Sequence, residues 1–301
     1  MPYRVPTSRI PNTMIERINE TRHRLSVLQE QISTGKRINR PSDDPIGAEL
    51  VINLRTSRAE IAHFQKIAVT ATQKLTAADN AFNNYQSNLD RVKSLLSAGL
   101  SDLTGQTSRD ALANELEALK NGVISFANTR NGNEFLFGGT RQTVPPFDPV
   151  TGVPSAQPAT AQFVQIEPGT NAMAVGVTAE SFLTEGGVTI TEDFDLAIAA
   201  LRGTGDPVAD QAALENAMTR MSVYQDLAAE RRSTIGVNMN SVDKARERLS
   251  TVDLSVLESI SNAEDADFAE AALALTDTQT TLEAILAITA RGQRSLIDYL
   301  G

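Results

Sequence analysis

The fold is decided by one uninterrupted stretch, residues 45–96, which reads PIGAELVINLRTSRAEIAHFQKIAVTATQKLTAADNAFNNYQSNLDRVKSLL. Counting alternately by four and three from Leu50 gives fourteen positions, of which thirteen are apolar. An apolar repeat of 3.5 residues sustained over more than six heptads is typical of a supercoiled helix. Asp44 is suited to cap the start of this helix, and Gly99 is suited to end it. At 1.5 Å per residue, the pattern predicts a helix about 80 Å long.

The same spacing recurs at both ends of the chain. One apolar stripe ends at Gly35, and another follows Asp267. A helix with a single apolar stripe is marginal in isolation, because its propensity does not offset nucleation and ordering. We therefore expect the two stripes to pair and to be covered by neighbouring copies, so that the ends order only on self-association. The predicted assembly interface consists of Met14, Ile18, Leu25, Leu28, Ile32, Phe268, Leu275, Leu282, Ile285, Leu296 and Tyr299.

Charge is unevenly distributed along the chain. Residues 1–40 carry eight basic and three acidic side chains, whereas residues 249–290 carry eight acidic side chains and no Lys or Arg. Opposite signs favour pairing of the two ends, although each exposed pair contributes only about 0–1 kcal/mol. The net charge of −10 argues against nucleic acid or acidic membranes as partners. No run approaches the roughly 18 apolar residues that membrane insertion needs, and the start lacks the apolar stretch of a cleaved signal peptide.

The middle of the chain differs in composition. Residues 138–187 hold six of the twelve prolines and a single basic residue, Arg141. Alternating apolar residues near Phe163 and Met173 predict a small antiparallel hairpin. Further helices are expected from Ser108 and from Asp206. The predicted fold class is mainly α, an elongated coiled-coil helical bundle formed by both chain ends, with a small β-rich outer domain inserted in the middle.

A distinctive segment follows the first stripe directly: residues 31–45 read QISTGKRINRPSDDP. This segment resembles the most recognisable N-terminal signature of the flagellin superfamily. Residues 131–140 (NGNEFLFGGT), 145–147 (PPF) and 295–300 (SLIDYL) look more like the superfamily members that join the hook to the filament than like filament flagellins. The resemblance covers about residues 1–147 and 191–301, and the insert only in outline. The signature turn comprises Gly35, Arg37, Asn39, Pro41, Asp43 and Asp44.

The resemblance implies a structural axial protein that is not an enzyme. Such a subunit is exported unfolded by the flagellar type III system without a cleaved signal peptide, and it lies outside the cell in the flagellum. Its implied partners are a hook-side junction protein, flagellin, copies of itself in a ring, and an export chaperone that binds the C-terminal helix. The implied domains are coiled-coil segments of an inner axial domain over residues 1–44 and 262–301, helical rod segments over 45–137 and 191–261, and the β-rich outer domain over 138–190.

Two glycine-containing segments could suggest nucleotide binding. Residues 202–206 (RGTGD) are similar to a dinucleotide loop, but Val208 stands where a third glycine is needed. Residues 99–107 are faintly similar to a phosphate-binding loop, but Gln106 stands where the phosphate-binding lysine belongs. We therefore expect a helix start and a turn between helices.

Metal and catalytic chemistry have little support in the sequence. His23 and His63 lack a second metal ligand at helical spacing. We therefore expect both side chains to be exposed on helices and not to bind a metal. The acidic groups at 43–44 and 264–267 are better explained by helix capping and solvated acidic faces than by cation binding. The chain has no cysteine, which excludes disulfides and thiolate catalysis. No catalytic residue, cofactor or metal is predicted.

Two other functions remain open from the sequence. A filament flagellin would share the superfamily features but polymerise into long filaments. A cytosolic coiled-coil adaptor would have ordered termini as a free protein and would stay inside the cell. An enzyme would require a pocket with convergent titratable groups, and the sequence shows no such constellation.

Overall fold

The computed structural model describes residues 9–101, 105–157 and 159–300, with side chains described between residues 13 and 290 apart from the same gaps. The chain divides into two compact units, one formed by residues 1–61 and 252–301 and one by residues 62–251. We call them the terminal unit and the central unit. Within the described residues, no helix combines the length and apolar character that crossing a membrane requires.

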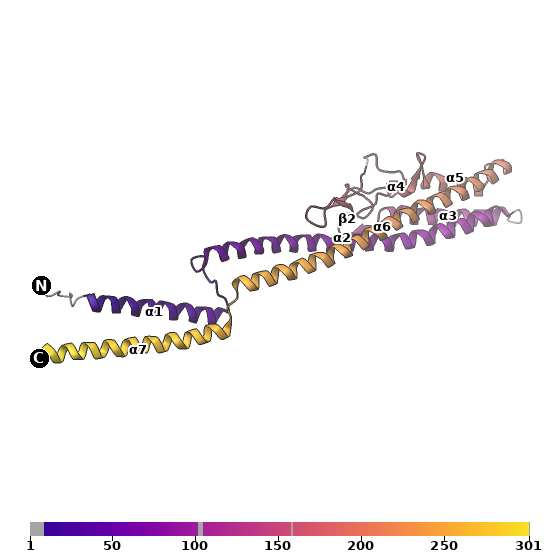
Figure 1. Ribbon diagram of the computed structural model, residues 1–301. Coiled ribbons are helices and arrows are strands. Elements are labelled where there is room, and N and C mark those ends of the chain that lie inside the picture. The colour runs from indigo at the N-terminus through magenta and orange to yellow at the C-terminus, as the bar shows by residue number, and fades with distance from the viewer. Residues whose placement is uncertain (1–8, 102–104, 158, 301) are drawn as a thin grey trace. The chain divides into compact units, whose positions relative to one another are not determined.

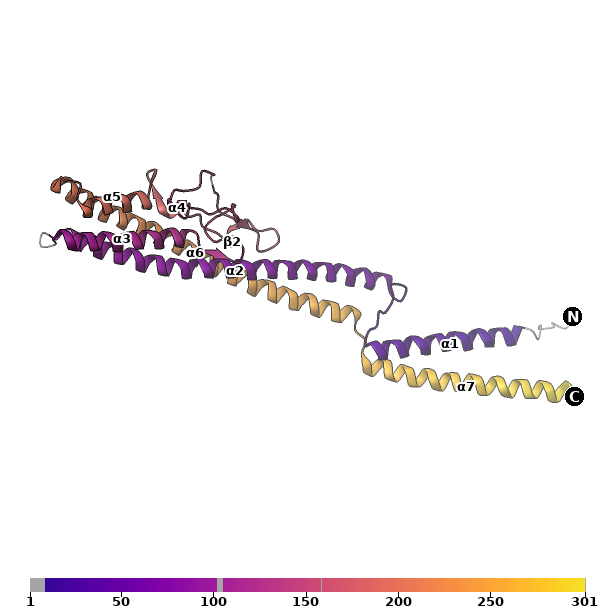
Figure 2. The same ribbon diagram turned by 180° about the vertical axis from the view of Figure 1, so that it is seen from behind.

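The terminal unit is built from the two ends of the chain. Helix α1 (Arg9–Thr34) and helix α7 (Phe268–Leu300) lie side by side and run antiparallel, as both views show (Figures 1 and 2). The same unit includes the first turns of α2 (Pro45–Gly99) and the last turns of α6 (Pro207–Glu264). The expected pairing of the two terminal stripes within one chain is confirmed.

Helix α2 follows the predicted pattern closely. The backbone N–H of Gly47 donates to Asp44 Oδ1 over 3.0 Å, so Asp44 caps the helix start as expected, and the helix ends at Gly99. The predicted stripe is buried or half-buried from Leu54 onward. Its first position is wrong: Leu50 is 51% exposed, and the neighbouring Val51 is buried instead. The apolar phase of the first two turns is therefore shifted by one residue.

The remaining helices belong wholly or largely to the central unit. Helix α3 (Gln106–Ala127) begins two residues before the expected Ser108 and packs beside α5 (Ile190–Arg202). Asp206 caps α6 as predicted, because its Oδ1 accepts from the N–H of Val208 over 3.1 Å. Helix α5 starts with a capping box, in which Thr189 and Glu192 each accept a hydrogen bond from the other residue's backbone N–H. The helices expected from Ser108 and from Asp206, which are α3 and α6, are both confirmed.

The described residues between α3 and α5 form three short antiparallel hairpins and one helical turn, α4 (Glu180–Leu183). The predicted hairpin is confirmed, with Phe163 paired with Ala174 and Val164 with Met173. Each strand is only two residues long, and much of the intervening chain is irregular. The strands pair as β1 (Arg130–Asn131) with β2 (Glu134–Phe135), β3 (Phe163–Val164) with β4 (Met173–Ala174), and β5 (Thr184–Glu185) with β6 (Val188–Thr189).

An aromatic cluster forms the centre of the central unit. Phe82 and Tyr85 from α2 meet Phe126 from α3, and all three contact Phe182 from α4, with ring centroids 4.8 Å apart for Phe82 and Phe182. Phe137 joins the same cluster. Residues 138–190 thus pack onto a core that they share with the helices. The division into five segments stays a prediction. Phe182 of the insert packs against aromatic rings from α2 and α3, so the insert has no separate aromatic core among these residues.

Candidate assembly interface

On α1, the predicted interface residues lie along the side that α7 covers. Leu28 is buried, with 9% of its surface exposed, and the other four predicted positions are half-buried. Those four are Met14, Ile18, Leu25 and Ile32. A stripe that one neighbouring helix covers only in part still has apolar surface to bury. The α1 stripe therefore has the burial expected of a seam that further packing could complete.

On α7, the structure brings some predicted residues to the seam and leaves one outside it. Leu275, Leu282 and Ile285 are half-buried against α1, whereas Phe268 at the helix start is 65% exposed. The side chains of Leu296 and Tyr299 lie outside the described residues. The structure therefore assembles one continuous seam from three of the six predicted α7 positions.

Threonines fill the remaining seam positions of α7. Thr278 is buried, and its hydroxyl donates to the carbonyl oxygen of Ala274 over 2.6 Å. Thr289 donates in the same way to Ile285 over 2.7 Å. A hydroxyl bonded to the carbonyl four residues earlier leaves mainly the methyl group facing outward. These threonines can therefore pack like small apolar residues.

Further apolar surface lies in the terminal unit, where the 3.5-residue count did not place it. Ten large apolar side chains of this unit are exposed among those described, and they are spread over α1, α2, α6 and α7. Sequence counting missed eight of them because they lie beside the counted stripes, whereas Leu50 and Phe268 were counted in the stripes. The ten are Ile15, Ile46, Leu50, Ile52, Val252, Leu254, Phe268, Leu273, Leu286 and Ile288.

A groove of about 350 Å³ runs along one side of the α1–α7 pair. Thr21 and Arg24 line it from α1, and Glu270, Leu273 and Asp277 are among its lining residues from α7. Among the side chains described between 13 and 290, no ion pair joins α1 to α7. Among these described side chains, the two helices therefore meet through apolar residues and threonines, and the charged side chains along the groove are exposed.

The expected pairing of opposite charges occurs instead at the linkers next to these helices. Gly35, with φ of +71°, ends α1, and its carbonyl accepts the N–H of Ala266 over 2.9 Å. The N–H of Arg37 donates to the carbonyl of Glu264 over 2.7 Å, and Lys36 and Asp265 form an antiparallel bridge between these bonds. We call residues 35–38 and 263–266 the linker clamp.

The carboxylate of Glu264 is the electrostatic centre of the clamp. Glu264 is 7% exposed, and its two oxygens lie 2.7 Å from Lys36 Nζ and 2.7 Å from Arg55 Nη2. Burial by itself raises the pKa of this carboxyl, but the hydrogen bonds from Lys36 and Arg55 outweigh burial and hold the pKa below its usual value. Glu264 therefore stays ionised and joins the linker after α1, helix α2 and the end of α6.

The signature turn is organised by its own carboxylates. Asp43 Oδ2 accepts the N–H of Arg40 over 2.8 Å and the N–H of Asn39 over 3.1 Å. Arg37 donates to Asp44 over 3.1 Å and to the carbonyl of Ala263 over 2.8 Å. The bond from the Gly47 N–H, followed by that from Arg37, lowers the pKa of Asp44. The turn therefore fixes the start of α2 and contacts the end of α6, while Pro41 is exposed within it.

The acidic groups weighed as cation sites act as caps and ion-pair partners. Asp267 Oδ1 accepts the N–H of Ala269 over 2.8 Å and the N–H of Glu270 over 3.1 Å at the start of α7. The expected capping is confirmed for Asp44 and Asp267. It is wrong for Glu264, which is a buried ion-pair partner and neither a cap nor a solvated acidic residue. In the part of the chain that the structure describes, no group of three or more His, Cys, Asp or Glu side chains could hold a metal ion.

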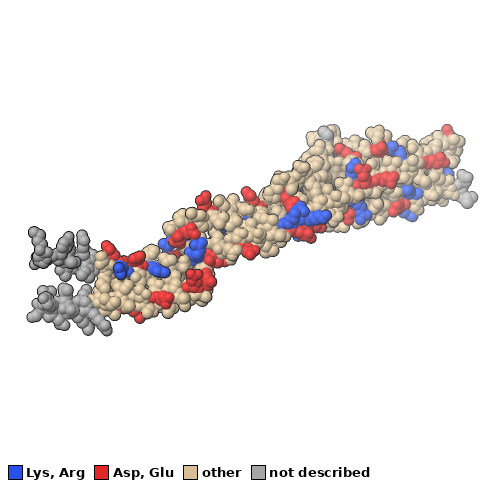
Figure 3. All heavy atoms as spheres, viewed as in Figure 1, with Lys and Arg blue, Asp and Glu red and all other residues tan. Residues whose placement is uncertain are grey.

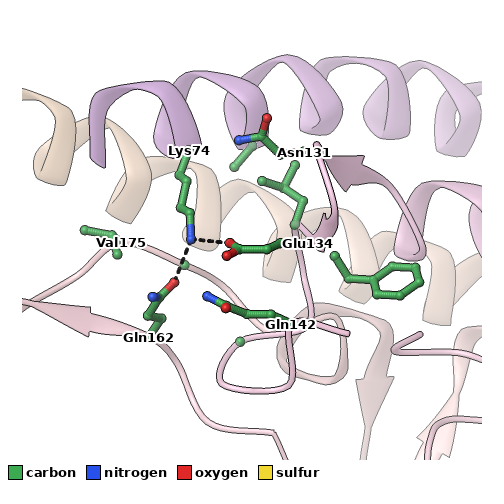
Figure 4. A pocket seen from close by; sticks show the side chains of 11 residues that line it. Lys74, Asn131, Glu134, Gln142, Gln162 and Val175 are labelled. Atoms are coloured by element: carbon green, nitrogen blue, oxygen red, sulfur yellow. Dashed lines mark hydrogen bonds and ion pairs between the residues drawn. The ribbon is translucent and has the colours of Figure 1, made fainter. Parts of the chain in front are cut away.

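A small enclosed pocket in the central unit offers little for catalysis. Lys74 Nζ donates to Glu134 Oε2 over 2.6 Å and to Gln162 Oε1 over 3.1 Å, while Asn131 and Gln142 lie nearby (Figure 4). The pocket has about 20 Å³ of free volume, which is room for about one water molecule. Lys74 therefore ties two hairpins to α2. Nothing in its sequence context indicated this role.

Basic and acidic side chains are mixed on the one face of the molecule that Figure 3 draws. On the face drawn in Figure 3, the basic and acidic residues that are coloured lie interspersed, without an extended basic stripe. Phosphate-binding surfaces need clustered Lys and Arg. This face therefore gives no support to a nucleic-acid partner.

Comparison with known families accounts for the helical parts of the chain. The bacterial flagellin N-terminal helical region matches residues 5–142, and the bacterial flagellin C-terminal helical region matches residues 212–300. The chain belongs to the flagellin superfamily. The N-terminal match includes the signature turn and the first half of the linker clamp, and the C-terminal match includes Glu264 and α7. Residues 143–211, with most of the insert, lie between the two matches.

Within the flagellin superfamily, the curated relatives include proteins of two kinds. Flagellar hook-associated protein 3 of Salmonella typhimurium is 29% identical over 126 residues, which are 42% of this chain and 40% of that protein. The protein of the same name from Escherichia coli is 27% identical over 124 residues, which are 41% of this chain and 39% of that protein. A flagellin of Clostridium tyrobutyricum is 25% identical over 194 residues, 64% of this chain and 48% of that protein. The matched part is less than half the length of each relative.

Solved structures show the same fold at low sequence identity. FlgL of Xanthomonas campestris has a TM-score of 0.62 at 16% identity, covering 69% of this chain and 99% of that chain. Hook-associated protein 3 of Legionella pneumophila has a TM-score of 0.61 at 13% identity, covering 70% of this chain and 99% of that chain. At these identities the likeness concerns the fold alone. It agrees with the predicted fold class of long helices with a small insert.

Proposed function

We propose that this member of the flagellin superfamily is a structural subunit of the bacterial flagellum that joins the hook to the flagellin filament. The α1–α7 pair and the exposed apolar residues of the terminal unit form its assembly interface. The observation that carries the proposal is the incomplete burial of the seam: among the predicted residues whose side chains are described, Leu28 alone is buried, and it is still 9% exposed. Resemblance to two hook-associated proteins of the same name supports the junction role.

The half-buried seam explains why neighbouring copies would be needed. Full burial of a Leu, Ile or Met side chain stabilises a fold by about 1.5–3 kcal/mol, and half-buried side chains realise only part of this. Leu282 and Ile285 on α7, with Leu25 on α1, can therefore gain free energy when a further helix covers them. Several such positions in a row would supply the driving force for assembly.

The partners and the route to the flagellum are part of the same proposal. The subunit would contact a hook-side junction protein on one side and flagellin on the other, and copies of it would form a ring. It would leave the cell unfolded through the flagellar type III system without a cleaved signal peptide, and a chaperone would bind α7 before export. A chain without cysteine forms no disulfide that could obstruct such passage.

A filament flagellin is the second candidate function. The alignment with the Clostridium tyrobutyricum flagellin covers more of this chain than the alignments with the hook-associated proteins. The two functions differ in copy number and place. A junction subunit would be found at one point of each flagellum, where hook and filament meet, whereas a filament flagellin would be found along the whole filament.

The assembly interface can be tested in cells that lack the chromosomal gene. Leu282→Asp places a charge in the half-buried seam, and Leu196→Asp makes the same change on α5 at a side chain that is 59% exposed. We expect cells without the protein to bear hooks without filaments. Leu196→Asp should restore filaments and motility, whereas Leu282→Asp should not, although its central unit still folds.

Electron microscopy with gold-labelled antibody measures both the filaments and the place of the subunit. Label confined to the point between hook and filament fits the junction role. Normal filaments in cells without the protein would contradict that role, and normal incorporation of Leu282→Asp would show that the α7 seam is not an interface.

A further inference from the structure

An apolar groove of about 300 Å³ lies between helix α2 and the β3–β4 hairpin in the central unit. Ala71 and Val175 line it and are buried, while Ile67 and Val164 line it beside them, are half-buried and pack against the central core. The groove is therefore an opening of the central core toward solvent. An apolar depression rimmed by polar side chains is typical of a contact site.

The rim of this groove is basic. His63 and Lys66 line it and are exposed, and among the described residues that line the groove none is Asp or Glu. Lys74 also lines it, but its ammonium already donates to Glu134 Oε2 over 2.6 Å (Figure 4). Lys66 makes no ion pair among the described side chains. An occupant of the groove should therefore bring a carboxylate close to Lys66.

A matching surface lies on the last turns of α6. Leu254 is 64% exposed, and Glu258 follows it one turn later on the same face of the helix. Thr251 and Ser255 are the small exposed neighbours on that face, so Leu254 is its large apolar side chain. Glu258 is exposed and makes no ion pair among the described side chains, and residues 249–290 contain no Lys or Arg.

We propose that the groove beside α2 takes Leu254 of a second copy of this chain, and that Glu258 of the second copy pairs with Lys66. The groove supplies apolar surface and an unpaired cation, and the α6 face supplies an apolar side chain and an unpaired carboxylate. The two surfaces complement each other in both respects.

The proposed contact joins two different surfaces, so it is head-to-tail. Each copy would carry one groove and one α6 face, and the contact could therefore pass from copy to copy until a ring closes or a helical array forms. A contact between two identical surfaces would stop at a dimer. This inference rests on the proposed function, in which copies form a ring, and it assigns the surfaces that meet in that ring.

Cysteine pairs can test the contact in intact flagella, because the chain itself has no cysteine. Thr70→Cys places a thiol in the groove, and Ser255→Cys places one beside Leu254. The full-length chain with both substitutions is produced in cells that lack the chromosomal gene, and their isolated flagella are treated with a short bismaleimide. Gel electrophoresis and immunoblotting then give the size of the cross-linked products.

Thr76→Cys with Ser255→Cys is the matched control pair. Thr76 is exposed on the same helix as Thr70, but it points about 120° away around the helix axis. We expect the pair Thr70→Cys, Ser255→Cys to give dimers, trimers and larger products, because each copy is joined on both sides. The control pair and each single-cysteine chain should lack this series.

Two changes on α6 test the apolar part of the contact. Leu254→Ser in the chain with Thr70→Cys and Ser255→Cys should abolish the series of products. Val252→Ser should leave the series unchanged, because Val252 is 48% exposed but lies on the opposite side of the same helix.

Reversed charges test the ion pair. Lys66→Glu and Glu258→Lys should each lose the series, because like charges would then meet across the contact. The two changes together exchange the charges and should restore the series. Lys244→Glu is the control for the altered net charge, because Lys244 is exposed on α6 and makes no ion pair among the described side chains; it should leave the series unchanged.

Several results would overturn this assignment. Products that stop at dimers, or that appear in a single-cysteine chain, would show that identical surfaces meet. A cross-link that leaves the chain at monomer size would show that the two surfaces meet within one copy. Restored filaments without the series, or exchanged charges that fail to restore it, would show that copies meet elsewhere. Failure of the proposed function would be seen separately, as normal filaments in cells without the protein.

Discussion

Replacing Phe182 by alanine tests whether the insert shares its core with the helices. The ring of Phe182 is fully buried and lies 4.8 Å from Phe82, 5.4 Å from Phe137, 5.8 Å from Phe126 and 6.0 Å from Tyr85, measured between ring centroids. Removal of a buried phenylalanine ring costs about 3–5 kcal/mol, because burial is lost and a cavity remains. Four ring neighbours, from α2, α3 and the segment directly before the insert, place Phe182→Ala toward the upper part of that range.

Urea unfolding of the full-length protein, followed by circular dichroism at 222 nm, measures this cost. With a slope of about 2 kcal/mol per molar urea, the midpoint should fall by roughly 1.5–2.5 M. Phe163→Ala is the matched control in the same insert, because Phe163 is 62% exposed and its loss should change the free energy of unfolding by less than about 0.5 kcal/mol. A loss below about 1 kcal/mol for Phe182→Ala would refute the shared core.

Three further changes test local features. Gly139→Ala should lower the melting temperature, because Gly139 has φ of +58° and a Cβ there would lie 2.2 Å from the carbonyl oxygen of Thr160; an unchanged melting temperature would contradict this. Asp193→Asn leaves half-buried Arg220 without the buried carboxylate that pairs with it and should cost about 1–3 kcal/mol in urea unfolding. Glu264 should add stability that is present above about pH 4.5 and lost as pH falls through its lowered pKa, so thermal melts from pH 3 to 7 should lose this acid dependence in Glu264→Gln.

The parts of the fold that sequence reasoning found are those with local signals. Asp44 and Gly99 were recognised as the start and the end of α2. Capping by a carboxylate and the missing side chain of glycine both act within one turn of the helix. The hairpin at Phe163 was found because alternation and a glycine turn are also local. The shift from Leu50 to Val51 was missed, because the helical phase at the start of α2 is set by neighbouring segments and not by the stripe itself.

The candidate site shows the same limit. The stripes of α1 and α7 could be counted, but the role of Glu264 could not, because Arg55 lies 209 residues away in the sequence. In the sequence, Glu264 is one acidic residue among several in a run, and its burial follows only from the meeting of α2, α6 and the signature turn. Lys74 was missed for the same reason, since its partners Glu134 and Gln162 belong to separate hairpins.

The threonines of α7 have a consequence for what can lie against this helix. Thr276, Thr278, Thr280 and Thr289 each donate their hydroxyl proton to the carbonyl four residues earlier. Because each proton already has an acceptor inside its own helix, a neighbouring molecule does not have to provide one. A purely hydrocarbon surface can therefore lie against any of these four threonines without stranding its hydroxyl donor.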